Sequence, residues 1–247
     1  MYWQQRYQFI FVLLLYISIL NSGFAQDSSK EFWPELDVWY KLTPSWRASV
    51  LIPISRNIET NYREGSFVCQ MDYSWGKPKR IIFMRMLNEE EAERIKNKMI
   101  RGGYLTGVSL DDKGQTYSEN TAFTEFHYRI PVKGSFLITH RLRADLRWMG
   151  NENEFSQRYR YRFMIEKELK AKKVSFVPYI NAETFYDSRF NTINRFRGIA
   201  GTSVSWSNRF AIESNFTYQY DSKSSVTNLY ATNLILHIYF QTKAASK

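Results

Sequence analysis

The sequence predicts an all-β fold: an up-and-down antiparallel transmembrane β-barrel of about 12 strands (10–12) with one short periplasmic helix. Three observations predict it. Hydrophobic side chains past residue 31 recur with a period of two, the period of a β-strand. Polar connections of alternating length separate these segments, and the chain begins with a segment typical of export. We therefore expect a signal peptide at residues 1–25 and one barrel domain at residues 26–247.

The N-terminal segment has the parts of a secretory signal peptide. Arg6 supplies a positive charge, residues 9–20 form an apolar run, and Gly23 and Ala25 precede the expected cleavage after Ala25. The apolar run has 12 residues, whereas a transmembrane helix needs about 20. No cysteine stands at the cleavage site, so a lipoprotein anchor is not expected.

The composition restricts partners and chemistry. The formal net charge is +10, and 17% of the residues are aromatic. A basic exported protein is expected to meet anionic lipid, lipopolysaccharide or acidic solutes, whereas export argues against nucleic acid. Cys69 is the only cysteine, which excludes an intrachain disulfide and a CxxC metal site. No sequence feature predicts a cofactor.

Eleven segments alternate apolar and polar side chains in the manner of strands. In one of them Val50, Ile52 and Ile54 alternate with polar positions such as Arg47 and Ser49. The predicted strands are 32–42, 46–55, 67–75, 100–110, 120–130, 135–149, 156–169, 174–187, 194–206, 209–220 and 228–240.

The connections between these strands alternate in length. The short ones are 43–45, 132–134, 170–173 and 207–208, and the longer polar ones are 56–65, 111–119, 150–155, 187–193 and 221–227. Tight turns at one end and longer loops at the other are typical of outer-membrane barrels.

The segment 88–98, NEEEAERIKNK, interrupts the strand pattern. Asn88 can cap a short helix that begins with glutamates and ends with lysines, in agreement with the helix dipole. We place this helix on the tight-turn, periplasmic side. Residues 80–87 are either a further strand or part of the insertion. Because bacterial single-chain barrels have even strand numbers, we expect either 80–87 or a piece near 26–31 to complete twelve.

Alternation alone does not say which face points inward, since a soluble lipocalin-like barrel has the reverse polarity. Predicted strands of 10–14 residues suit a tilted membrane crossing of about 9–11 residues, whereas a soluble strand is typically about 5–6. Aromatic residues also collect at strand ends, as the interfacial girdles of a membrane barrel require. Arg141, Arg143 and Arg147 share one face, and an arginine facing lipid would cost about 2–4 kcal/mol. We therefore place the arginines in the lumen.

Several strings resemble one family of proteins. They are EFWPELDVWYKL (31–42), IRGGYLTG (100–107), RLRADLRW (141–148), QRYRYRF (157–163), VPYINAETFYD (177–187) and NRFRGIAG (194–201), together with the closing aromatic strand. The family comprises uncharacterised Gram-negative outer-membrane β-barrels catalogued only as a domain of unknown function. The resemblance covers nearly the whole mature chain. It implies a barrel in the outer membrane that meets outer-membrane lipid, lipopolysaccharide and the barrel-assembly machinery, and it brings no established activity or ligand.

The face assignment gives an inventory of charged residues in the lumen. The basic residues are Arg47, Arg101, Arg129, Arg141, Arg143, Arg147, Arg158, Arg160, Arg162, Arg195 and Arg197; the acidic residues are Glu35, Asp37, Asp72, Glu125, Asp145, Glu166, Glu183 and Glu213. One interpretation is a basic constriction that attracts anionic solutes. The other is a lattice of arginine–carboxylate pairs that stiffens and largely plugs the barrel, which the near balance of charge favours. The candidate site is the network of Arg141, Arg143, Arg147, Arg158, Arg160, Arg162, Arg195 and Arg197 around Glu183, which we expect to contact the most arginines.

A membrane-embedded lipid hydrolase or acyltransferase is the rival function. It would need a histidine beside a nucleophile. We expect His127 and His237 inside the barrel and His140 outside, and no Gly-x-Ser-x-Gly motif occurs. The sequence therefore predicts neither catalytic residues nor a metal site. It favours an outer-membrane barrel that passes or binds small anionic solutes, with a structural or partner-binding barrel as the alternative.

Overall fold

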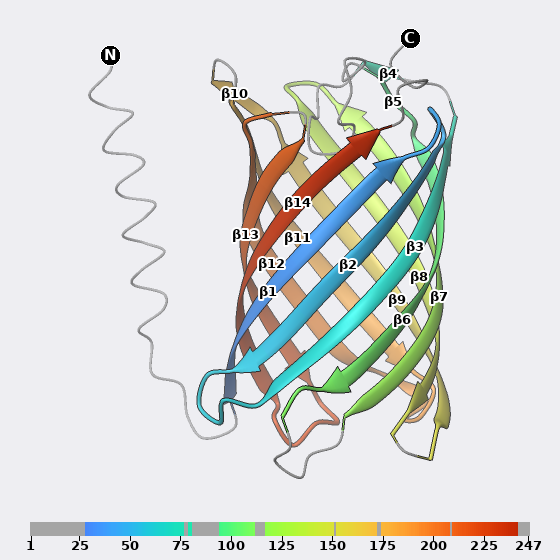
Figure 1. Ribbon diagram of the computed structural model, residues 1–247, viewed down its shortest axis with the longest axis vertical. Coiled ribbons are helices and arrows are strands. Elements are labelled where there is room, and N and C mark those ends of the chain that lie inside the picture. Colours follow the sequence, from blue (N-terminus) through green and yellow to red (C-terminus); the bar gives the residue numbers. More distant parts are fainter. Residues whose placement is uncertain are drawn as a thin grey trace, which may run out of the picture.

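The computed structural model describes residues 28–76, 79–80, 94–111, 117–150, 152–171, 174–207 and 209–241 (Figure 1). The predicted signal peptide, residues 81–87 and the first part of the predicted helix lie outside these residues. Within them, no helix is long and apolar enough to cross a membrane.

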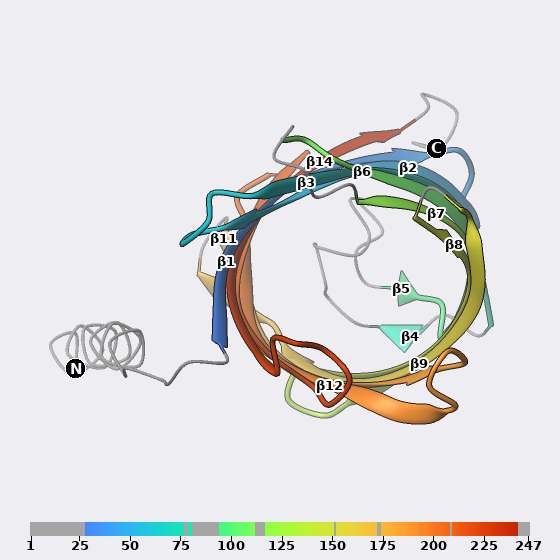
Figure 2. The same ribbon diagram turned by 90° about the horizontal axis from the view of Figure 1, so that it is seen from below.

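Eleven long strands close into a barrel, as Figure 2 shows from one end. They are β1 (Ser28–Lys41), β2 (Trp46–Asn57), β3 (Arg63–Trp75), β6 (Lys98–Ser109), β7 (Ser118–Val132), β8 (Phe136–Met149), β9 (Glu154–Lys167), β11 (Val174–Asp187), β12 (Thr192–Ser205), β13 (Phe210–Asp221) and β14 (Asn228–Gln241). Each predicted strand coincides with one of them, so the all-β barrel is confirmed. The twelfth strand of the sheet is the short β10 (Leu169–Ala171), which pairs with β11.

The barrel closes through a parallel pair. All neighbouring long strands are antiparallel except β1 and β14, which pair in parallel from Ser28 and Asn228 to Lys41 and Gln241 (Figure 1). An odd number of up-and-down strands makes the first and last strand run in the same direction, and parallel pairing then leaves neither edge open. We expected an even number of long strands, but the described residues form eleven. The twelfth strand of the sheet is the short β10.

The connections follow the predicted alternation. The short turns lie at one end of the barrel together with the insertion between β3 and β6, and the longer loops lie at the other end (Figure 1). The insertion contains β4 (Lys79–Arg80) and β5 (Arg94–Ile95), which pair antiparallel over the barrel mouth (Figures 1 and 2). The helix predicted for 88–98 is wrong at its C-terminal end. Residues 94 and 95 bond across the hairpin to β4, and residue 98 already begins β6.

The two faces of the barrel have opposite polarity. In β8, Leu142 and Leu146 on the outer face are 55% and 42% exposed, whereas Asp145 and Arg147 on the inner face are 1% and 4% exposed. The same holds around the ring, because most buried side chains are polar or charged and large apolar side chains are exposed. A soluble protein buries its apolar residues instead. The predicted inversion of polarity is therefore confirmed as a property of the fold.

One glycine makes room for an aromatic ring in the lumen. A Cβ atom on Gly103 would lie 2.4 Å from Cζ of Phe123, so only glycine allows this close approach. The Phe123 ring in turn lies 3.9 Å from the guanidinium carbon of Arg143. β6 and β7 thus position an apolar surface on which a lumenal arginine packs.

Candidate binding site in the barrel lumen

An ion-pair lattice, defined as the lumenal arginines of β6, β8 and β9 with their carboxylate partners, occupies one side of the lumen. Glu183 on β11 is completely buried and accepts hydrogen bonds from Arg141, Arg160 and Arg162 at 2.5, 2.9 and 3.0 Å. The strand register causes this, since Glu183 lies directly opposite Arg162 on the neighbouring strand. A carboxylate between three guanidinium groups is held by charge-assisted hydrogen bonds.

A second carboxylate in the lattice has as many arginine partners as Glu183. Glu125 lies 3.3, 3.4 and 2.9 Å from nitrogens of Arg101, Arg141 and Arg143. It also lies 2.8 Å from Nε2 of His127. Arg141 therefore bridges Glu125 and Glu183, and the expectation that Glu183 contacts the most arginines holds only jointly with Glu125.

Ion pairs continue from the lattice toward both ends of the barrel and include acidic residues that the sequence inventory missed. Further pairs are Arg47–Asp72, Arg143–Asp145, Arg158–Asp145, Arg147–Glu119 and Arg195–Asp221, with N–O distances of 2.9, 2.5, 2.9, 2.9 and 2.6 Å. Asp187 lies 3.6 Å from Arg147. Glu119 and Asp187 share the parity of Glu125 and Glu183 on their strands, so the alternation of inward and outward positions could have identified them.

Little water reaches this lattice. Its central carboxylates Asp72, Glu125, Asp145 and Glu183 are at most 2% exposed. Breaking such a buried pair leaves an uncompensated charge, which makes the loss of one partner costly. The arrangement agrees with the lattice interpretation, in which charge pairs fill and stiffen this part of the barrel.

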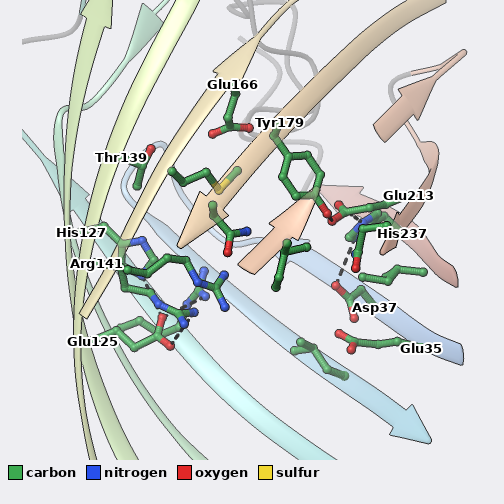
Figure 3. Close-up of a pocket in the computed structure, with 18 of the residues that line it drawn as sticks. Glu35, Asp37, Glu125, His127, Thr139, Arg141, Glu166, Tyr179, Glu213 and His237 are labelled. Carbon is green, nitrogen blue, oxygen red and sulfur yellow. Dashed lines mark hydrogen bonds and ion pairs between the residues drawn. The ribbon is translucent and has the colours of Figure 1, made fainter. Parts of the chain in front are cut away.

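A cavity of about 410 Å³ lies inside the barrel, and all eleven long strands contribute to its lining. Figure 3 shows its two sides. Glu125, His127 and Arg141 lie on one side, and Asp37 and His237 lie on the other. The volume falls in the range of about 300–1,000 Å³ that is usual for small-molecule sites.

Two arginines in the cavity lining have no carboxylate partner among the described residues. Arg129 is 5% exposed, its Nη2 lies 3.3 Å from Sδ of Met99, and its Nε has no partner. Arg197 donates from Nε and Nη2 to Oε1 of Gln219 at 3.0 and 2.5 Å. The other nine arginines of the predicted lumen inventory each form an ion pair. Uncompensated charge therefore lies at the cavity.

An acidic cluster, defined as Glu35, Asp37 and Glu213, forms the opposite wall. His237 lies between two of its members, with Nδ1 3.1 Å from Oδ2 of Asp37 and Nε2 3.2 Å from Oε2 of Glu213. The hydroxyl of Tyr179 donates to Glu213 (Figure 3). Sequence reasoning missed Tyr179, although it shares the inward parity of Glu183 on β11.

Several neutral polar side chains in the lining have a buried atom that lacks a hydrogen-bond partner. The most buried of them are Gln70, Thr139 and Asn181, which are 9%, 7% and 8% exposed. Nε2 of Gln70, Oγ1 of Thr139 and Oδ1 of Asn181 bond to nothing within the described part of the chain. A buried polar group without a partner costs about 1–3 kcal/mol. A polar molecule in the cavity would satisfy these groups.

The histidines lie on the faces that the sequence predicts. His127 and His237 line the cavity, and His140 on the outer side lies 2.8 Å from the Tyr161 hydroxyl. Among the described residues, neither serine nor cysteine lines the cavity, and no group of three His, Cys, Asp or Glu is arranged to hold a metal ion. The geometry thus offers charge and hydrogen bonds to a ligand.

The fold and the lumen define the protein as a β-barrel with a charged interior and an apolar exterior. The chain belongs to the family described as Protein of unknown function (DUF2490), whose model matches residues 93–230, or 138 of 247 residues. The resemblance to a domain of unknown function is thereby confirmed. No curated protein and no solved structure matches the chain.

Proposed function

We propose that the protein is an outer-membrane β-barrel, exported by its N-terminal signal peptide, that binds small anionic solutes in an arginine-lined and largely plugged lumen. The long strands have 12–15 residues, which is enough for a tilted crossing of about 9–11 residues with margins at both interfaces. Hydrocarbon offers no hydrogen bonds to the backbone, so a sheet that crosses it must be closed. The parallel closure by β1 and β14 meets this requirement.

The outer surface supports the same proposal. Aromatic pairs lie at the strand ends, with Trp46 packed on Tyr73 at a centroid distance of 4.8 Å near the tight turns and Trp148 on Phe155 at 5.6 Å near the long loops. Such aromatic girdles suit the two membrane–water interfaces. Between them the exposed side chains are apolar, as for Leu142.

The observation that supports an anionic solute is the absence of a carboxylate partner for Arg129 among the described residues. A buried guanidinium without a carboxylate is costly, and an anion in the cavity would compensate its charge. Arg197 lines the same cavity and donates its hydrogen bonds to the neutral amide of Gln219. Because the lattice fills part of the lumen, it supports binding of a solute rather than free passage through the barrel. The same lattice is also expected in the alternative, a structural barrel that binds no solute.

Calorimetry with carboxylates tests the proposal. The mature chain in detergent is titrated with butyrate, and Arg129→Gln and Arg197→Gln are expected to weaken binding about tenfold or more, since a hydrogen bond to a charged group contributes about 1.5–3 kcal/mol. Arg56→Gln is the matched control, because Arg56 is exposed and its side chain donates to Asn61 in the same loop region, away from the cavity. No binding by the unchanged protein, or equal losses in all three variants, would contradict the proposal.

A further inference from the structure

We infer that the cavity accepts a zwitterionic solute, with its carboxylate toward Arg129 and its ammonium group toward the acidic cluster. This inference rests on the proposed function and deepens it, because it names the class of anion. Such a solute carries two opposite charges on one small body, as ω-amino acids do. The cavity carries the complementary charges on two different walls.

The acidic cluster holds more negative charge than its surroundings compensate. Asp37 and Glu213 share one histidine, so their two negative charges exceed the single positive charge that His237 can carry. Glu35 forms no ion pair with a cation among the described residues. Asp37 is 4% exposed, and its Oδ1 has no hydrogen-bond partner. An additional cation at this wall would reduce the repulsion between the buried carboxylates.

The positive wall lies on the other side of the lumen. Around the ring, β7 is four strands from β1 in the order β1-β2-β3-β6-β7, and the barrel has eleven long strands. Arg129 on β7 therefore lies across the lumen from Asp37 on β1. Figure 3 shows the same separation, since His127 of β7 lies opposite Asp37 and His237. The two uncompensated charges are thus separated by the cavity and do not neutralise each other directly.

An ammonium group fits the acidic cluster better than a metal ion does. No group of three potential metal ligands converges among the described residues, whereas an ammonium group donates three hydrogen bonds without a strict coordination geometry. The unpartnered Gln70, Thr139 and Asn181 supply further polar contacts in the same cavity. Its volume of about 410 Å³ falls in the range of about 300–1,000 Å³ that is usual for small-molecule sites, which is room for a solute of amino-acid size.

The test compares solutes that differ only in the ammonium group. The mature chain in detergent is titrated with 4-aminobutyrate and butyrate, and with 6-aminohexanoate and hexanoate. We expect at least one amino acid to bind about tenfold or more tightly than its matched carboxylate. Asp37→Asn and Glu35→Gln should remove this preference and leave butyrate binding unchanged or stronger, whereas Arg129→Gln should weaken both solutes. Glu59→Gln in an exposed loop is the control.

The outcomes separate this inference from the proposed function. If both carboxylates bind as tightly as their amino analogues, the zwitterion is excluded while anion binding stands. If none of the four solutes binds, both proposals fail. If the preference survives in both Asp37→Asn and Glu35→Gln, the acidic cluster is not the ammonium site and the inference is overturned. The comparison within the unchanged protein needs no variant, so poor folding of one variant does not prevent the test.

Discussion

The lumen contains charges that are paired in the lattice and charges at the cavity that are not. In the lattice, Glu125 and Glu183 each contact three arginines. At the cavity, Arg129 has no carboxylate partner and Asp37 keeps an unpartnered oxygen. Paired charges hold strands together, whereas unpaired buried charges cost free energy unless a ligand compensates them. On the basis of this difference we propose a structural role for the lattice and a binding role for the cavity.

The largest expected effect is the loss of a lattice carboxylate. Glu183→Gln removes the negative charge that three arginines share, and we expect the free energy of unfolding to fall by about 3–5 kcal/mol. Urea unfolding of the protein in lipid vesicles measures it. Glu35→Gln is the matched control at the cavity, where removing one of three neighbouring carboxylates should leave stability unchanged or higher. Equal losses in the two variants would contradict the distinction between the lattice and the cavity.

A charge on the outer face should lower the free energy of unfolding by nearly as much. Leu142→Arg places a guanidinium on the exposed face of β8, and we expect a loss of about 2–4 kcal/mol in vesicles. Ile58 lies in a long loop and is 56% exposed, close to the 55% of Leu142. Ile58→Arg should therefore cost only about 0–1 kcal/mol. If the two substitutions cost the same, the outer face does not contact hydrocarbon.

The unpaired arginine should behave unlike its paired neighbours. Arg129→Met removes a buried charge that has no carboxylate partner, so we expect stability to stay the same or rise by about 1 kcal/mol. Arg162→Met deprives Glu183 of a partner at 3.0 Å and should lower stability. Unfolding of the two variants under identical conditions decides the matter, and a larger loss for Arg129→Met would show that Arg129 belongs to the lattice.

The smallest effect is expected outside the lumen. Arg189 lies in the loop after β11 and donates to Asp187, and this hydrogen bond raises the pKa of Arg189. The pair is partly exposed, so Arg189→Ala should cost about 0.2–1 kcal/mol. The loss should shrink in 1 M salt, where the screening length is about 3 Å. A loss of stability as large as that of Glu183→Gln would contradict this prediction and show that Arg189 belongs to the lattice.

The strands and their faces could be predicted because the pleat imposes a period of two whatever the neighbouring strand is. The partner of each charged side chain depends on the register between two strands, which the sequence of one strand does not determine. Arg129 lies opposite Thr139. Arg197 lies between Gln219 on one side and Glu183 on the other and donates to Gln219. The sequence does not mark these positions as different from the paired arginines. The odd number of long strands was missed for a similar reason, since parallel pairing of β1 with β14 joins segments about 200 residues apart.

The most direct test of the inverted polarity uses Cys69, the only cysteine of the chain. It lies at mid-strand on the exposed face of β3, opposite Tyr104, which is 49% exposed. In vesicles, a fluorophore on Cys69 should be quenched by lipids brominated in the acyl chain and not by iodide in the water. Quenching by iodide, without quenching by the brominated lipids, would contradict an outer surface that lies in hydrocarbon.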